Sequence, residues 1–262
     1  MNVSFPVELL YPASGFGVGV LVGMTGVGGG SLMTPLLILL FGIHPVSAVG
    51  TDLLYAAATK TGGSLIHGLA RTIDWKIVGL LASGSVPATA ICLFVLSHFD
   101  LSGGAARALI TTALGVALYL TALVLIFRRR ILASYASRFG DLSPARTTLL
   151  TVLVGATLGI LVSISSVGAG AMGVTALIVL YPQLPTSRIV GTDIAHAVPL
   201  TLVGGIGYWI LGSIDWHLLG LLLIGSIPGI FVGSYLATRV PETALRLVLS
   251  ATLIAVATRL LF

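Results

Sequence analysis

The sequence predicts an all-α polytopic membrane protein built from two inverted repeats of about five helical elements each, with short or broken helices at glycine-rich breaks. The first observation behind this prediction is compositional. The 262 residues are 56% hydrophobic and only 8% charged, and the mean hydropathy is +1.11, whereas soluble domains carry about 25% charged residues. The second is a pair of motifs that recur at constant spacing, and the third is an uneven distribution of Lys and Arg between alternate connections.

The composition excludes a soluble enzyme, a disordered segment, a disulfide-rich secreted module and a nucleic-acid-binding domain. The net charge of +5 does not indicate nucleic acid, because the cations lie in short connections between apolar stretches rather than on one basic face. The single cysteine, Cys92, lies in an apolar run and has no second cysteine to pair with. No Lys or Arg precedes the first apolar segment, so we expect no cleavable signal peptide.

An internal duplication organises the chain. Gly-Thr-Asp at 50–52 recurs at 191–193, and Ile-Asp-Trp at 73–75 recurs at 214–216, both 141 residues later. Because Asp and Trp are rare in this sequence, agreement of both motifs at one spacing indicates a duplication. The predicted division is a first repeat, a polar cytoplasmic linker and a second repeat: 1–127, 128–146 and 147–262.

Each half divides into five apolar elements. In the first half they are 9–26, 31–43, 46–69, 76–98 and 105–127, and in the second they are 148–166, 169–182, 187–211, 217–238 and 243–262. The last three of each half reach the roughly 20 residues that a helix needs to cross a bilayer. The second is too short and follows a break, so the first two are either a span plus a half-helix or a re-entrant hairpin.

The basic residues predict the orientation. With the linker in the cytoplasm, ten of the thirteen Lys and Arg residues fall in cytoplasmic connections: Arg71, Lys76, Arg128, Arg129, Arg130, Arg138, Arg146, Arg188, Arg239 and Arg246. This assignment gives the two halves opposite orientations and leaves both termini periplasmic. Inverted repeats of this kind are typical of secondary transporters.

Two breaks separate the first and second elements of each half, at 25–31 and 163–170. Glycine disfavours a continuous helix by about 1 kcal/mol relative to alanine, and backbone freed at membrane depth needs a partner. A half-helix beginning at each break directs free N–H groups and a positive dipole end into it, which favours an anion. The hydroxyls expected to contact that anion belong to Thr25, Ser31, Ser165 and Ser166. The alternative is that both breaks are close helix-packing points.

The third element of each half places its polar residues on one helical face. The predicted cavity-lining or coupling residues are Asp52, Tyr55, Lys60, His67, Asp193, His196, Thr201 and Tyr208. Ionisable groups within spans usually face a cavity or a partner. Lys60 is a counter-charge for substrate, a structural partner of a carboxylate, or an interfacial side chain. Asp52 and Asp193 either hold the backbone of the breaks in place or bind a coupling ion. His196 is either a group that titrates near neutral pH or a buried histidine whose hydrogen bonds are satisfied within the core.

Further residues have structural interpretations. Asp74 and Asp215 stand where the fourth element of each half begins and are expected to cap it. Pro87 and Pro228 lie inside the fourth elements, where we expect them to kink the helix.

The glycine-rich break, Pro35 and Gly-Thr-Asp, with the break and the Gly-Thr-Asp motif duplicated, resemble the TauE/SafE family of bacterial transporters, often described as sulfite exporters, over essentially the whole chain. The resemblance implies transport of sulfite, sulfonates and related anions across the inner membrane. It also implies substrate contact from Gly28, Gly29, Gly30, Ser31, Ser166, Gly168, Ala169 and Gly170. The second break departs from the family pattern, because Ala169 replaces the glycine at 29 and Ala171 replaces the serine at 31.

The sequence therefore predicts a secondary transporter that moves a small sulfur-containing anion across the bacterial inner membrane by alternating access. A coupling proton or cation is a candidate partner, membrane lipid surrounds the chain, and no cofactor, metal or nucleic acid is expected. The alternatives are a carrier for another small anion, such as a carboxylate, and a passive anion channel. An enzyme is not expected, because the sequence holds no nucleophile–base or metal-binding motif.

Overall fold

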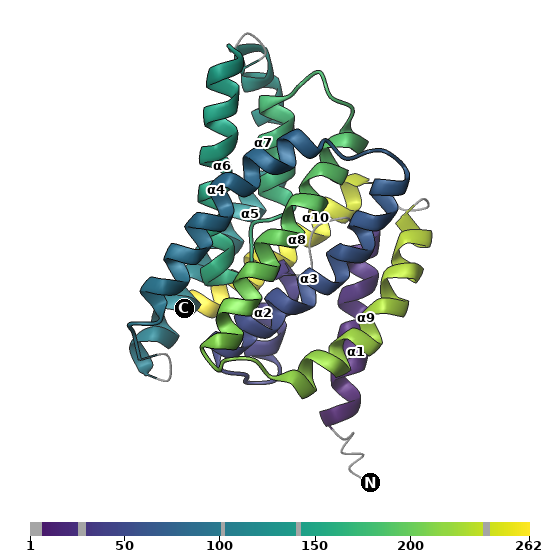
Figure 1. Cartoon of the computed structure of the whole chain (residues 1–262). Helices are drawn as coiled ribbons and strands as arrows, with labels where there is room; N and C mark the ends of the chain where they lie inside the picture. The colour runs from purple at the N-terminus through teal and green to yellow at the C-terminus, as the bar shows by residue number, and fades with distance from the viewer. Residues whose placement is uncertain (1–6, 26–29, 101–102, 140–142, 238–241) are drawn as a thin grey trace.

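The computed structural model describes residues 7–25, 30–100, 103–139, 143–237 and 242–262. Within these ranges all regular secondary structure is α-helical, as the sequence predicts (Figure 1). Ten helices follow one another: α1 Val7–Thr25, α2 Gly30–Leu39, α3 Pro45–Leu69, α4 Trp75–Leu96, α5 Gly104–Phe139, α6 Pro144–Ser165, α7 Ala171–Leu180, α8 Thr186–Ile210, α9 Trp216–Ala237 and α10 Glu242–Leu261. Each corresponds to one apolar element expected from the sequence.

Helix length divides the helices into long and short ones. In the described residues, five stretches are long and apolar enough to cross a membrane: Trp75–Leu96, Gly104–Arg128, Pro144–Ser165, Thr186–Ile210 and Trp216–Gly233. α3 and α8 both contain 25 residues, but α3 is the more polar of the two. α2 and α7 have 10 residues each, which corresponds to about 15 Å, half of the hydrocarbon thickness. They are the short helices that the glycine-rich breaks predict.

The predicted linker 128–146 does not begin where a helix ends. α5 continues without interruption through 36 residues to Phe139, and α6 begins at Pro144. Most of the polar stretch therefore prolongs α5.

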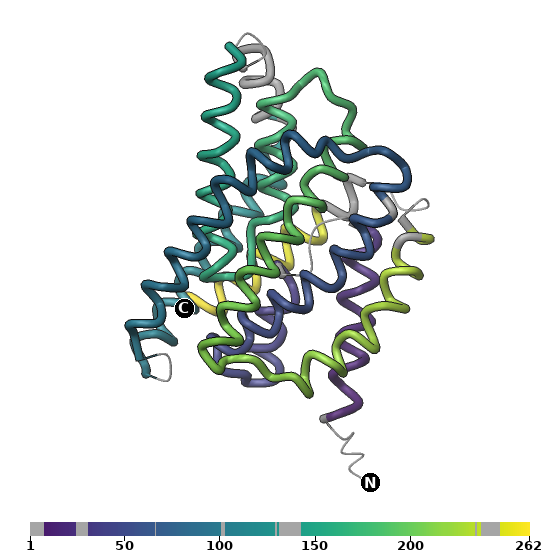
Figure 2. The backbone as a smooth tube through the Cα atoms, viewed as in Figure 1, coloured from purple at the N-terminus to yellow at the C-terminus, as the bar shows by residue number. Residues whose placement is uncertain are grey.

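The two halves of the chain are interleaved. The most extensive helix contacts join α1 to α9, α4 to α6, α3 to α8 and α5 to α10. Each of these pairs takes one helix from α1–α5 and one from α6–α10, and Figure 2 shows α3 and α8 side by side. Because every major contact crosses between the halves, neither half buries its apolar faces alone.

Glycines make two of these contacts close. A Cβ atom on Gly15 of α1 would overlap the carbonyl oxygen of Leu222, and one on Gly225 of α9 would overlap that of Pro12. The α4–α6 pair repeats the arrangement, since a Cβ on Gly84 would overlap the carbonyl oxygen of Val152. Small residues at such positions let membrane helices approach each other, so part of the glycine excess is structural.

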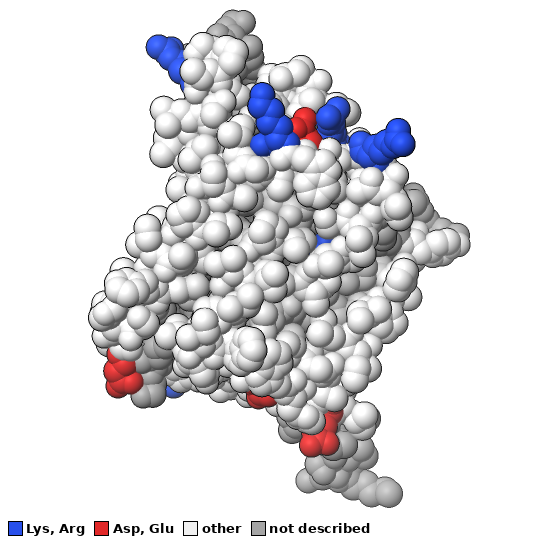
Figure 3. Space-filling model, in the orientation of Figure 1, with Lys and Arg blue, Asp and Glu red and all other residues white. Residues whose placement is uncertain are grey.

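The two halves run in opposite directions. The α3–α4 connection lies at the upper end of the molecule and the corresponding α8–α9 connection at the lower end (Figure 1). Lys and Arg gather at the upper end, whereas Asp and Glu are mostly at the lower end (Figure 3). Many large apolar side chains on the surface between the ends are exposed, as a lipid-facing surface requires.

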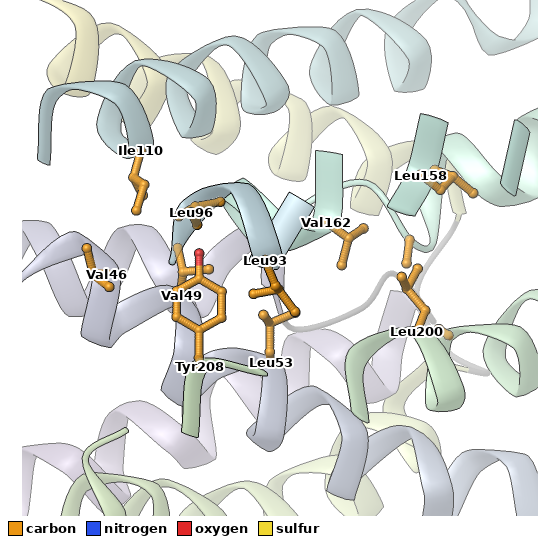
Figure 4. Packing of buried hydrophobic residues seen from close by; sticks show 12 residues of the cluster. Val46, Val49, Leu53, Leu93, Leu96, Ile110, Leu158, Val162, Leu200 and Tyr208 are labelled. Atoms are coloured by element: carbon orange, nitrogen blue, oxygen red, sulfur yellow. The ribbon is translucent and has the colours of Figure 1, made fainter. Parts of the chain in front are cut away.

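A hydrophobic cluster holds the centre of the bundle together. It joins side chains from α3, α4, α5, α6 and α8, with Leu53, Leu93 and Tyr208 close to one another (Figure 4). This cluster fixes α3 and α8, the helices that carry the predicted polar face, against the surrounding helices.

Candidate functional site

Except for the half-buried His67, the predicted polar residues of α3 and α8 are buried within the bundle. Asp52 and His196 are 0% exposed, Asp193 is 1% exposed and Lys60 is 8% exposed. Since α3 packs against α8, both carboxylates and the ammonium group belong to one interior region. Charged groups removed from water in this way are costly and are usually functional.

Asp52 is anchored to the half-helix of its own repeat. Thr34 of α2 donates a hydrogen bond from its hydroxyl to Oδ2 of Asp52, at 2.5 Å. The other oxygen, Oδ1, has no hydrogen-bond partner among the described residues. The hydroxyl of Ser166, from the second break, lies close enough to this carboxylate to interact with it, although the geometry falls short of a hydrogen bond. Asp52 thus connects α3 with α2 and with the second break.

Asp193 lies against the other half-helix, α7. A Cβ atom on Gly173 would collide with Oδ1 of Asp193, so the carboxylate lies directly over the α7 backbone. Within the described ranges Oδ1 of Asp193 accepts no hydrogen bond. The two carboxylates therefore differ, because a side-chain hydroxyl donates to Asp52 while Asp193 lies against a glycine.

Lys60 interacts electrostatically with both carboxylates. The structure has no direct ion pair between Lys60 and either of them in the part of the chain that it describes. An ammonium group that is buried but not bound directly to a carboxylate keeps attraction for a further anion.

Two hydrogen bonds related by the repeat flank this charged cluster. His196 of α8 bonds through Nε2 to the Ser85 hydroxyl of α4 at 2.9 Å, and Tyr55 of α3 donates to Ser226 of α9 at 2.5 Å. Tyr55 and His196 occupy equivalent positions of the two repeats, as do Ser85 and Ser226. Nδ1 of His196 has no partner among the described residues.

The second break is buried except for the half-buried Ile164, and its own residues shape it. Ser166 caps α6 with a φ of 58°, and Gly168 and Gly170 have φ values of 125° and 121°, which an L side chain rarely adopts. The Ser165 hydroxyl donates to Leu161 O at 2.6 Å and accepts from Val167 N at 3.1 Å. The chain then enters α7 at Ala171, whose N-terminus therefore faces the interior. Ser166 is 7% exposed, and its buried hydroxyl lacks a hydrogen-bond partner in the described structure.

A model of the sulfite exporter TauE/SafE family matches residues 11–260 of this chain. The chain belongs to the TauE/SafE family. It is similar to the probable membrane transporter proteins YjnA and YdhB of Bacillus subtilis. YjnA is 40% identical over 90% of this chain and 93% of its own length. YdhB is 29% identical over 88% of this chain and 91% of its own length. The probable membrane transporter protein MJ0441 of Methanocaldococcus jannaschii is 24% identical over 97% of this chain and 96% of its own. No solved structure is significantly similar. The chain is accordingly a membrane transporter.

The first break of this TauE/SafE chain is described only at its edges. Thr25 ends α1 and Gly30 begins α2, whereas Gly28 and Gly29 lie outside the described residues. Ser31, in the first turn of α2, is buried at 4% exposure. The predicted substrate contacts of this break stay predictions.

Other predicted residues form hydrogen bonds to groups outside the charged cluster. The Tyr208 hydroxyl donates to Ser163 O at 2.9 Å from within the hydrophobic cluster of Figure 4. The Thr201 hydroxyl donates to Ala197 O of its own helix at 2.8 Å. His67, near the end of α3, bonds through Nδ1 to the Thr72 hydroxyl at 2.8 Å.

The duplicated motifs interlock in a way that sequence reasoning missed. The Thr192 hydroxyl accepts a hydrogen bond from the Asp74 backbone N–H at 2.9 Å, and Thr51 accepts one from the Asp215 N–H at 3.2 Å. Each Gly-Thr-Asp motif thus binds the Ile-Asp-Trp connection of the other repeat. The recurrence of both motifs at one spacing was the available signal, but pairing across the repeats needs the tertiary structure.

The predicted caps are confirmed. Asp74 accepts from the backbone N–H groups of Lys76 and Ile77, and Asp215 accepts from that of Leu218. Asp74 also forms a 3.3 Å ion pair with Arg188 at the start of α8. Pro87 lies inside α4 and Pro228 inside α9, where the expected kinks stay predictions.

Proposed function

We propose that this TauE/SafE chain is a secondary transporter for a small sulfur-containing anion such as sulfite or a sulfonate. The observation that carries the proposal is the buried second break, which leads into the N-terminus of α7 and leaves the Ser166 hydroxyl without a partner in the described structure. Backbone N–H groups and a positive dipole end favour a negative ligand. A sulfonate or sulfite group offers several oxygens to such donors.

The buried ammonium group of Lys60 supports an anion next to this break. Ser166 lies beside Asp52, and Asp52 interacts electrostatically with Lys60. An anion at the α7 N-terminus is therefore near a buried ammonium group, which offsets part of the cost of moving the anion out of water. The proposed contacts combine Ser166 and the α7 backbone with Lys60, and by repeat symmetry they include the α2 N-terminus beginning at Gly30 and Ser31.

Alternating access follows from the interleaved halves. The Asp74–Thr192 bond and the Asp215–Thr51 bond each fasten one α3–α4 or α8–α9 connection to the other repeat, at opposite ends of the bundle. Loosening one contact while the other holds exposes a central anion to one side only. We place the protein in the bacterial inner membrane with the α5–α6 turn in the cytoplasm and both termini in the periplasm, because Lys and Arg gather at that end (Figure 3).

Initial uptake rates into proteoliposomes test this function. Purified protein is expected to take up sulfite, methanesulfonate and thiosulfate with saturable kinetics, and to take up acetate and lactate at least tenfold more slowly. Lys60→Gln is expected to lower the uptake of sulfur anions at least tenfold. Lys76→Gln, which removes an exposed cation at the start of α4, is the matched control and keeps the normal rate.

Three results would contradict the proposal. Faster uptake of the carboxylates would assign another substrate class, and flux without saturation would indicate a channel. Equal rates for Lys60→Gln and Lys76→Gln would remove Lys60 from the site.

A further inference from the structure

We propose that Asp193 carries a proton that enters and leaves the site together with each anion, so that the transporter couples anion movement to the proton gradient. The inference rests on the proposed function and adds the coupling ion and the residue that binds it.

The charge of the buried cluster motivates the inference. Asp52, Asp193 and Lys60 are all at least nine-tenths buried, and with both carboxylates ionised they carry one net negative charge. A monovalent anion beside Lys60 raises that excess to two negative charges in a region that solvates charge poorly. A proton on one carboxylate removes one of these charges. Anion binding and proton binding therefore favour each other, and this linkage is reciprocal.

The contacts of the two carboxylates assign the proton to Asp193. The hydroxyl of Thr34 donates to Asp52, and such a donor stabilises a negatively charged oxygen. Oδ1 of Asp193 instead lies against the backbone of Gly173, with no donor to it from the described residues. Protonation of Asp193 costs no bond at this oxygen, whereas protonation of Asp52 at either oxygen weakens the charge-assisted bond from Thr34.

His196 is a second proton-binding group on the same helix as Asp193. His196 follows one helical turn later on α8, is 0% exposed and has Nδ1 without a partner in the described structure, so it is placed to pass a proton to or from Asp193. Described α7 has no titratable side chain, and α6 has only Arg146, at its exposed start. The remaining titratable and charged groups of the helices packed on α8 are Asp52, Tyr55, Lys60 and His67 of α3, and Lys76 and Cys92 of α4 with its cap Asp74.

Accumulation of methanesulfonate in proteoliposomes tests the coupling. This probe is chosen because its sulfonate group stays ionised, so any proton that moves with it is carried by the protein. With the membrane potential held at zero and the outside one pH unit more acidic, one proton per anion predicts about tenfold accumulation. Asp193→Asn is expected to show no accumulation above the external concentration but to retain exchange of internal for external methanesulfonate. The control Asp215→Asn is expected to retain accumulation, because Asn also caps a helix.

The outcomes separate this inference from the proposed function. Accumulation by the unmodified protein that ignores the pH gradient overturns the inference, and so does normal accumulation by Asp193→Asn. If Asp193→Asn fails to fold, the unmodified protein is titrated calorimetrically with methanesulfonate in two buffers of different ionisation enthalpy. The difference in heat gives the number of protons bound with each anion. Uptake of about one proton per anion supports the inference and uptake of none overturns it. Absence of methanesulfonate exchange by the unmodified protein contradicts the proposed function itself.

Discussion

The bond between Thr34 and Asp52 is expected to contribute measurably to stability. Thr34→Val keeps the shape of the side chain and removes the hydroxyl that donates to Oδ2 of Asp52. Because Asp52 is 0% exposed and its other oxygen has no partner among the described residues, water cannot replace the lost donor without rearrangement. The variant therefore leaves a buried carboxylate without the one side-chain hydrogen bond that the structure gives it.

The free energy of unfolding that Thr34→Val removes lies between two limits. Hydrogen bonds to charged groups contribute about 1.5–3 kcal/mol, whereas polar contacts between membrane helices average about 0.6 kcal/mol and reach about 1.7 kcal/mol. The burial of Asp52 favours the upper end of the membrane range, about 1.5–1.7 kcal/mol. For a chain of this size that loss lowers Tm by roughly 3–7 °C.

The repeat provides a matched control. Thr175 lies in α7, the half-helix of the second repeat, but its hydroxyl donates to Ala171 O of its own helix at 2.7 Å. Such i−4 bonds contribute little to helix stability, so Thr175→Val is expected to shift Tm by less than about 2 °C. Both variants are measured by thermal unfolding of purified protein in detergent. Equal shifts for the two would refute the reasoning, because the contact with Asp52 would then have no effect of its own.

Two further predictions concern the half-helix and the interlocked motifs. Gly173→Ala places a Cβ against the Asp193 carboxylate and is expected to lower the initial rate of sulfite uptake at least tenfold. The control Gly220→Ala places its Cβ in open space and is expected to keep the normal rate. Equal rates for the two variants would contradict the placement of Asp193. Thr192→Val removes the acceptor for the Asp74 N–H. It is expected to lower the free energy of unfolding by about 1 kcal/mol and Tm by roughly 2–4 °C. An unchanged Tm would show that the hydrogen bond between the two motifs does not stabilise the fold.

Patterns along the chain predicted the helices well. Apolar runs of 20 residues or more, bounded by Pro, Asp or Gly, require only local information, and the expected cap at Asp74 depends on residues within one turn. The repeat added the correspondence between α3 and α8, because equal spacing of rare residues indicates equal elements. The extension of α5 to Phe139 was missed, since a polar stretch after an apolar span resembles a linker although its residues also form helix.

The partners of the site residues could not be predicted in the same way. A helical projection placed Tyr208 on the same face as Asp193, but the structure puts its hydroxyl on Ser163 O within an apolar cluster. A projection gives the face of one helix and not the helix that covers it. Thr34 and Gly173 were not singled out for the same reason, because each matters only through the carboxylate that packs against it.

The position of a bound anion tests the central claim most directly. Selenite is a heavier analogue of sulfite, and its selenium atom can be located by anomalous scattering in crystals of the protein. The account predicts one selenium peak within hydrogen-bonding reach of the Ser166 hydroxyl and the N-terminus of α7, on the side of Lys60. Selenium bound only elsewhere, for example in the apolar pocket lined by Leu96 and Leu109 between α4 and α5, would contradict it.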